Sequence, residues 1–325
     1  MTEPLMVGVD VGGTSMKGAL VDRRGRFVSR AVRRPTRLRG DEGSDEVVES
    51  ILDFAHRLVD RGRARHGRDA VQGVGLVIPG IIDEERGVAL AAINVEWRGD
   101  PIVERLRRRI GLPATLGHDA RSAGLAEGVW GRARGSGDYL FIAVGTGVGA
   151  AVVLSGQPYF RSHGAGGEFG HITVNGRGPD CTCGRTGCVE AYAGGRSIGR
   201  RYTARSNAPM PVEGREVMER MLAGDRVAAH VWRDAVWALG TAIVDTTVLL
   251  SPDVVVIGGG VAEAGRVLFD PLRAEVRDQM PAFHQHPPPP IVPAHFRRRA
   301  GIVGAALRGW LGCGYSPGDL SGSAS

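Results

Sequence analysis

Short apolar runs that end in glycines recur along the chain. Residues 5–11 (LMVGVDV) form such a run, a glycine pair then turns the chain, and residues 16–21 predict a second strand. Residues 139–154 (YLFIAVGTGVGAAVVL) repeat the order of strand, glycine turn and strand. This repetition indicates two related halves.

Amphipathic helical patterns separate the predicted strands. In residues 45–60 apolar side chains recur at the three- and four-residue spacing of one helix face. Longer helices are predicted for residues 214–223 and 226–250, whereas residues 281–293, which are rich in proline, predict a surface loop. Strands that alternate with helices indicate an α/β protein.

Length and composition narrow the function classes. A chain of 325 residues with 42% hydrophobic content is long enough for two globular domains. The net charge of +6 comes from scattered arginines, with Lys17 as the only lysine, and the short basic clusters lack interleaved aromatic residues. A solvated surface is therefore favoured over nucleic-acid binding. No apolar run has the length of a membrane span and no secretion signal is visible, so we expect a cytoplasmic protein without a membrane partner.

The first glycine turn has the chemistry of a phosphate site. Gly12 and Gly13 expose backbone N–H groups at a strand end, and Thr14 adds a hydroxyl. Asp10, at the end of the strand, is suited to hold a magnesium ion through water. An ordinary hairpin turn explains the same residues equally well.

Two further glycine clusters strengthen the phosphate interpretation. If the two halves pack face to face, both strand-connecting turns point into one cleft that can hold the triphosphate of ATP. A third cluster follows the buried-looking strand 254–257 and is small enough to leave space for adenosine. The residues of the second and third clusters are Gly145, Thr146, Gly147, Gly258, Gly259 and Gly260.

The dipeptide His118-Asp119 stands immediately before a predicted helix. An aspartate in this position is commonly an N-cap that accepts hydrogen bonds from the first amides of the helix. The functional alternative is a general base that accepts the proton of a substrate hydroxyl as it attacks phosphorus. The local sequence alone favours the cap.

The most specific chemical pattern is a cluster of one histidine and three cysteines. His171, Cys181, Cys183 and Cys188 match a tetrahedral zinc site, and interspersed glycines provide the tight loops that such ligands need. Three cysteines this close together do not form a disulfide framework in a chain of this size. Since protein ligands fill all four positions, the predicted zinc is structural.

Polar residues beside this cluster are candidates for sugar contacts. Glu168 lies in a glycine-flanked loop before His171, and Glu190 follows the last cysteine by two residues. Carboxylates on loops that a metal fixes are good acceptors for sugar hydroxyls, although most surface glutamates are simply solvated. Asn94 is a further candidate contact or a turn residue.

These motifs together resemble the ROK family of repressors and kinases, and most closely its bacterial glucokinases. The specific parts are DVGGT at 10–14, GAGGEFGH at 164–171 and CTCGRTGCVE at 181–190. The resemblance implies an actin/hexokinase-like fold that binds ATP and Mg²⁺ and transfers the γ-phosphate to the 6-hydroxyl of a hexose. It also implies that Asp119 is the catalytic base.

The resemblance extends to the remaining site residues. It implies that Glu168, His171 and Glu190 contact the sugar, and that the histidine–cysteine cluster binds zinc. Kinases of this kind are often homodimers or higher oligomers.

One departure from the family concerns the choice of sugar. The family usually has asparagine before the catalytic aspartate, whereas this chain has His118. An imidazole is larger than an amide and titrates near neutrality. Glucose is the leading substrate, and N-acetylmannosamine, N-acetylglucosamine and fructose are alternatives.

Two functions from other classes compete with the kinase. A family repressor carries a DNA-binding segment before the first strand, and only nine residues precede Asp10 here. A catalytically inactive sugar-binding regulator is the other alternative.

The sequence predicts two domains and a flexible tail. The small domain comprises residues 1–117 and 300–318, which include a C-terminal helix near 300–312. The large domain comprises residues 118–299, and the tail comprises residues 319–325.

Overall fold

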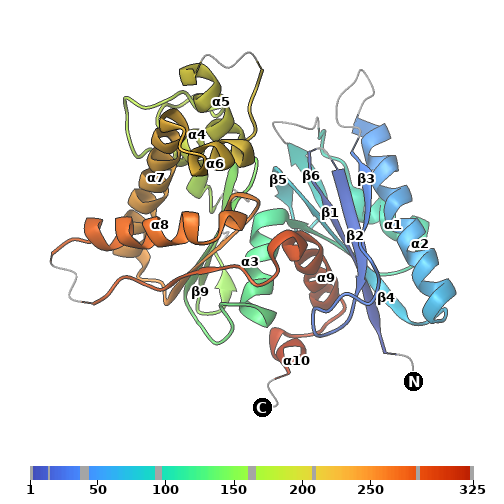
Figure 1. Ribbon diagram of the computed structural model, residues 1–325. Helices are drawn as coiled ribbons and strands as arrows, with labels where there is room; N and C mark the ends of the chain where they lie inside the picture. The colour runs from blue at the N-terminus through green and yellow to red at the C-terminus, as the bar shows by residue number, and fades with distance from the viewer. Residues whose placement is uncertain are drawn as a thin grey trace. The chain divides into compact units, whose positions relative to one another are not determined.

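The computed structural model describes most of the chain, namely residues 3–13, 15–36, 44–91, 97–159, 166–206, 210–282 and 286–322. These residues form two compact units (Figure 1). Unit 1 comprises residues 1–134, 160–166 and 299–325, and unit 2 comprises residues 135–159 and 167–298. Within the described ranges, no helix has both the length and the apolar character needed to cross a membrane.

Unit 1 is an α/β unit to which the end of the chain returns. Its elements are β1 (Leu5–Val11), β2 (Ser15–Val21), β3 (Val32–Pro35), α1 (Ser44–His66), β4 (Val71–Ile78), β5 (Ile81–Asp83), β6 (Val88–Ala91), α2 (Ile102–Ile110), β7 (Ala114–His118), α3 (Asp119–Trp130), α9 (Ala300–Gly312) and α10 (Pro317–Ser321).

Unit 2 carries most of the helices in the second half of the chain. Its elements are β8 (Tyr139–Val144), β9 (Val148–Leu154), β10 (Gln157–Pro158), η1 (Phe169–His171), α4 (Val189–Ala193), α5 (Gly195–Ser206), α6 (Gly214–Leu222), α7 (Arg226–Leu250), β11 (Val254–Gly258), η2 (Val261–Ala264), α8 (Arg266–Gln279) and β12 (Ile291–Pro293), with η3 (Arg297–Arg299) at its boundary with unit 1.

The two units contain five-stranded sheets of the same topology. The first sheet has the order β3-β2-β1-β4-β7 and the second has the order β10-β9-β8-β11-β12. In each sheet, the first three strands pair antiparallel and the last two pairings are parallel. The expectation of two related halves, drawn from the repeated glycine turns, is therefore met by the sheet topology.

Helices cover both faces of the first sheet. Helix α1 lies on one face, and its predicted apolar positions, from Val48 to Val59, are buried against the strands. Helix α9 packs on the other face together with α3, as Figure 1 shows. Glycines permit this close approach, since a Cβ atom on Gly8 would lie 2.3 Å from the carbonyl oxygen of Ile302 in α9.

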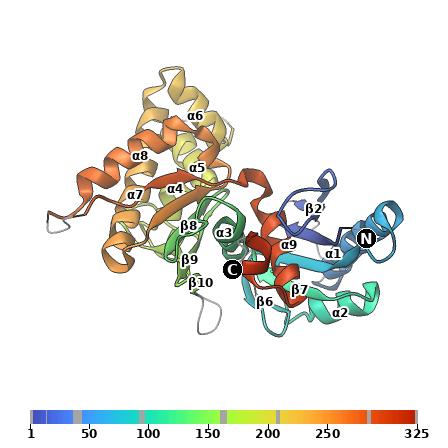
Figure 2. The ribbon, with the colours of Figure 1, turned by 90° about the horizontal axis from the view of Figure 1, so that it is seen from below.

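The second sheet has its helices gathered beside strands β8 and β9 (Figure 2). Helix α7 forms the centre of this layer and contacts α4, α5, α6 and α8. It begins where predicted because Asp225 is its N-cap, with a carboxylate that accepts hydrogen bonds from the amides of Val227 and Ala228. Its buried side chains and those of the sheet form one apolar core.

Two local expectations differ from the structure. Residues 291–293 form β12, although the proline-rich run predicts a loop, because an edge strand pairs on one side only and tolerates Pro293. Near the C-terminus, residues 319–321 belong to α10 in place of the expected tail. Ser316 and Asp319 form a capping box there, and the indole of Trp130 donates to the carbonyl of Leu320.

Candidate functional site

Asp10 is the last polar residue of β1 and lies beside the first glycine turn. Burial raises the pKa of Asp10 to about 6, Lys17 across the β1–β2 pair opposes the shift, and the nearby Asp119 adds to it. The first turn of α9 also packs against this carboxylate, since a Cβ atom on Gly301 would lie 2.4 Å from the carboxyl carbon. A half-buried carboxyl with a raised pKa is suited to accept a cation that restores its charge.

Asp119 is the first residue of α3, and His118 ends β7 as the N-cap of that helix. The carboxylate of Asp119 accepts a hydrogen bond from the adjacent amide of Ala120 at 2.6 Å, and its side chain is 42% exposed. The local interpretation of Asp119 as the N-cap is therefore wrong. Its carboxylate stays accessible at the end of the sheet, where a substrate hydroxyl can approach it.

His118 has a buried nitrogen directed at this carboxylate. Its Nδ1 lies 3.2 Å from Oδ1 of Asp119. The two atoms are within ion-pair distance but lack hydrogen-bond alignment, and Nδ1 has no hydrogen-bond partner among the described residues. An unsatisfied buried nitrogen beside a candidate base is a place where a bound hydroxyl can be recognised.

Glu84 is a site residue that the sequence did not reveal. Its carboxylate, 8% exposed, accepts hydrogen bonds from the backbone N–H of His118 and the guanidinium of Arg121, each at 3.2 Å. Arg308 of α9 forms a further ion pair with it. This network fixes the β7–α3 junction and so the position of Asp119. Because the partners are up to 224 positions apart in the chain, no local pattern could have indicated them.

The second glycine turn connects β8 and β9 and is held by Glu190. The carboxylate of Glu190 accepts a hydrogen bond from the amide of Val148 at 2.8 Å. A Cβ atom on Gly147 would lie 2.3 Å from the same carboxylate, so a larger residue there would displace the Glu190 side chain from the turn. The carbonyls of Gly145 and Thr146 accept hydrogen bonds from the start of α5. Glu190 thus fixes the turn with one oxygen of its carboxylate.

The predicted metal cluster comes together in unit 2. The ligand atoms of His171, Cys181, Cys183 and Cys188 all lie within 4.8 Å of one another. The sulfur atoms of Cys183 and Cys188 are 3.7 Å apart, and Nδ1 of His171 is 3.6 Å from the sulfur of Cys181. A tetrahedral site with Zn–S bonds of about 2.3 Å separates its sulfurs by about 3.8 Å. The donor set and its spacing therefore fit zinc.

The thiols of the cluster have unequal pKa values. A hydrogen bond from the backbone of Arg185, first, and then the neighbouring thiols lower the pKa of Cys183. Burial, with contributions from the neighbouring thiols, raises the pKa of Cys188 to about 12. A buried thiol with so high a pKa ionises when a cation is adjacent, which is the environment that a bound metal provides.

His171 contacts both the cluster and a candidate sugar residue. While Nδ1 faces the thiols, Nε2 lies 4.0 Å from the carboxylate of Glu168. A carboxylate that faces the second nitrogen of a metal-binding histidine orients the ring and sets its tautomer. The structure therefore brings His171 and Glu168 together as one unit beside the metal cluster.

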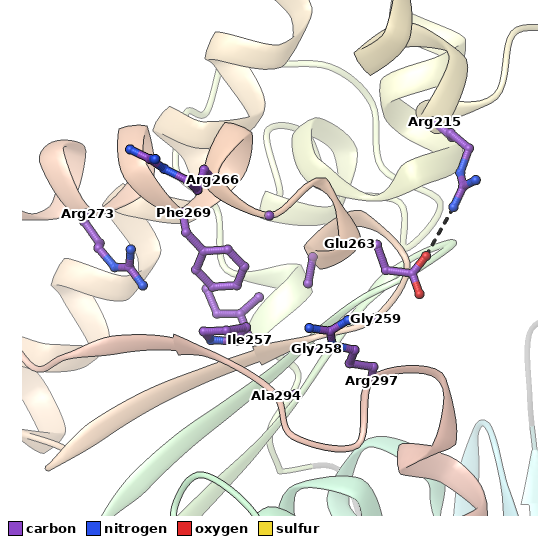
Figure 3. Close-up of a pocket in the computed structure, with 13 residues that line it drawn as sticks. Arg215, Ile257, Gly258, Gly259, Glu263, Arg266, Phe269, Arg273, Ala294 and Arg297 are labelled. Carbon is purple, nitrogen blue, oxygen red and sulfur yellow. Dashed lines mark hydrogen bonds and ion pairs between the residues drawn. The ribbon is translucent and has the colours of Figure 1, made fainter.

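A cavity of about 530 Å³ opens beside the third glycine cluster (Figure 3). Gly258 and Gly259 line it, and Gly260 does not. Its opposite wall includes Phe269, and Glu263 lies at one side, joined to Arg215 by an ion pair. The volume is in the range of small-molecule sites. Since strand β11 ends here, the cavity lies at the carboxyl edge of the second sheet.

Some predicted residues fall outside the described ranges. Thr14 of the first turn and Asn94 are among them, and so is the start of the segment 164–171. The predictions for Thr14 and Asn94 therefore stay predictions. Gly12 and Gly13 do form the predicted turn, in which the amide of Gly12 donates to the carbonyl of Ser15.

Comparison with known proteins is consistent with this arrangement. The ROK family model matches residues 6–308. The chain belongs to the ROK family. Its sheets and solved neighbours have the actin/hexokinase-like fold.

Individual relatives of this ROK protein include sugar kinases. It is 31% identical over 320 residues to a glucokinase of Streptomyces coelicolor, a match that covers 93% of this chain and 96% of the relative. It is also 31% identical to an N-acetylmannosamine kinase of Escherichia coli, covering 93% and 97%. A crystal structure of a Streptomyces griseus ROK glucokinase with glucose and AMPPNP has a TM-score of 0.80 at 30% identity and covers 93% of this chain and 98% of that one.

Proposed function

We propose that this protein is an ATP-dependent hexose kinase that transfers the γ-phosphate of ATP to the 6-hydroxyl of a hexose, with glucose as the preferred sugar. The observation that carries the proposal is the pair formed by the accessible Asp119 and the half-buried Asp10 in unit 1. Phosphoryl transfer needs a base for the attacking hydroxyl and a cation for the nucleotide charge, and these carboxylates suit the two tasks.

The proposed roles divide between the units. In unit 1, Asp119 accepts the proton of the 6-hydroxyl and Asp10 holds Mg²⁺ through water. In unit 2, Glu168, His171 and Glu190 bind the sugar hydroxyls. The glycine turns of both units bind phosphate oxygens, and the cavity beside Gly258 and Gly259 accepts adenosine.

The histidine–cysteine cluster is proposed to bind one structural zinc ion. All four positions around the ion are filled by His171, Cys181, Cys183 and Cys188, so the ion has no open position for catalysis. Its proposed task is to fix the loop between η1 and α4. Both ends of that loop carry sugar-binding candidates, since His171 ends η1 and Glu190 belongs to α4.

N-acetylmannosamine is the second candidate substrate. The relative that phosphorylates it is as similar in identity as the glucokinase, and His118 departs from the usual asparagine of the family. A panel of hexoses and N-acetylhexosamines with ATP and Mg²⁺, read by ADP release, separates the two. Turnover of neither sugar by folded, metal-loaded protein would instead favour the inactive sugar-binding regulator.

Asp119→Asn tests the proposed base. This change keeps the shape of the side chain and removes its proton affinity, so we expect turnover to fall by about 10²- to 10⁴-fold. Sugar affinity measured by calorimetry should change by less than about threefold. Turnover within a few fold of the unmodified enzyme would rule out Asp119 as the base.

A further inference from the structure

A second cavity of unit 2 lies apart from the candidate sugar and nucleotide residues. Its volume is about 520 Å³, and it is lined by the segment 175–179, by α5 and by the middle of α7. Contacts among α4, α5 and α7 bring these elements together (Figure 2). Among the residues that the structure describes, none of those assigned above to the sugar, the nucleotide or zinc lines it.

Positive charge exceeds negative charge in this cavity. Arg177, Arg201 and Arg205 all line it, and Asp234 is the one acidic side chain among the described residues that line it. Arg201 and Arg205 both pair with Asp234, whereas Arg177 comes from the segment between the metal-cluster residues His171 and Cys181. Three guanidinium groups around a single carboxylate leave a site that an anion can neutralise.

One of the three cationic groups, Arg201, is held in place by an aromatic ring and by backbone carbonyls. Arg201 is buried, its guanidinium lies 4.8 Å from the ring centre of Tyr192, and it donates to the carbonyls of Tyr192 and Val231. Tyr192 in turn meets Trp237 edge to face at 5.6 Å, and both rings line the cavity. A fixed guanidinium beside an aromatic wall is preorganised for a ligand with an anionic end and a less polar body.

We propose that this cavity binds a small phosphate monoester. The phosphate is bound by Arg177 and Arg205 at the cavity mouth, with Arg201 behind them, and the body of the ligand packs against Trp237. Guanidinium groups suit phosphate because their planar N–H forks match its oxygens.

Helix α4 connects the cavity with the candidate sugar residues. Within four positions of the chain it carries Glu190, which holds the second glycine turn, and Tyr192, which lines the cavity, while the metal-cluster residue Cys188 is its N-cap. A ligand that contacts Tyr192 therefore acts on the helix that positions Glu190. This regulatory consequence rests on the proposed kinase function, whereas binding itself does not.

Binding is tested on the full-length protein without turnover. With glucose and a non-hydrolysable ATP analogue at saturating concentration, glucose 6-phosphate is titrated by calorimetry and by tryptophan fluorescence, and inorganic phosphate is titrated separately. We expect one bound ester per chain and a fluorescence change that Trp237→Phe abolishes while calorimetric binding remains. Tighter binding of the ester would identify a sugar phosphate as the ligand, and equal binding would identify free phosphate. The first outcome supports the proposal, whereas the second would overturn the ester as the ligand, because its body would then contribute nothing to binding.

Arginine variants decide whether this cavity is the binding site. The double variant Arg177→Ala/Arg205→Ala should weaken binding by at least about tenfold, since each loses a charge-assisted hydrogen bond. Arg200→Ala, on the same helix α5 but outside the cavity, removes the same charge and should change affinity by less than about twofold. Arg177→Ala alone serves if the double variant does not fold.

Three further results would overturn the proposal. They are no saturable binding of either probe, equal weakening by Arg200→Ala, and unchanged affinity in a folded Arg177 variant. Because the assay measures binding with both substrate sites filled, loss of kinase activity in any variant does not affect its interpretation.

Discussion

Nδ1 of His118 lies 3.2 Å from Oδ1 of Asp119 without a hydrogen bond between them. A buried nitrogen in this state costs folding free energy and is retained where a ligand uses it. We expect His118→Phe, which keeps a ring and removes the nitrogen, to leave the melting temperature equal or higher. The KM for the sugar should rise by at least about tenfold, because a sugar hydroxyl loses Nδ1 of His118 as its hydrogen-bond partner.

His118→Asn is the matched variant for specificity, since it restores the side chain usual in the family. On its best sugar, this variant should turn over within about tenfold of the rate of the unmodified enzyme. The order in which it prefers hexoses and N-acetylhexosamines should change. An unchanged ranking in both variants would show that His118 does not contact the sugar.

The raised pKa of Asp10 predicts how the folding stability of the protein changes with pH. Burial raises the pKa of Asp10 from 3.8 to about 6, so the folded protein binds the proton more tightly than the unfolded chain. Folding stability from this group is fully present below pH 3.8 and is lost as pH rises through about 6. Asp10→Asn should therefore stabilise the protein at pH 8, by about 2–3 kcal/mol.

The same variant should lose turnover, because an amide does not replace the carboxylate beside Mg²⁺. Denaturant unfolding at pH 4 and pH 8 checks the first effect, and the ADP-release assay checks the second. A variant less stable than the parent at pH 8 but not at pH 4 would contradict the inferred cost of the ionised carboxyl.

The metal cluster predicts one zinc ion per chain. Cys188→Ser removes a buried ligand and should abolish zinc in elemental analysis and weaken sugar binding by at least about tenfold, because the loop after η1 loses its anchor. Cys313→Ser is the control, since Cys313 lies in unit 1, and it should keep zinc and affinity unchanged. Freshly purified protein without zinc would refute the assignment.

Two adjacent glycines should respond differently to alanine. Gly259 has φ +87°, and a Cβ atom there would lie 2.3 Å from the carbonyl oxygen of Val144. Gly260 has helical φ, and a Cβ atom on it meets nothing within 4 Å. We expect Gly259→Ala to lower unfolding free energy by at least about 2 kcal/mol and Gly260→Ala to change it by at most about 1 kcal/mol. Equal effects in thermal unfolding would contradict this geometry.

Local sequence patterns were sufficient to predict most helices and strands and to predict that the metal-cluster residues lie together. The strands that flank each glycine turn and the long helix α7 follow from side-chain periodicity and capping, which depend on near neighbours. The four metal-cluster residues lie within 18 positions, so their spacing alone indicated a shared ion. The strand β12 was missed because its pairing with β11 is not local.

The sequence by itself determined the repeated glycine turns, the residues of the histidine–cysteine cluster and membership of the ROK family, because residue identity at short spacing carries that information. Only the tertiary structure decided that Glu84 and Arg308 hold the β7–α3 junction, that Asp10 packs against α9, and that three arginines share one cavity. These relations join residues far apart in the chain, and they arise from the packing of helices on sheets, which no local pattern records.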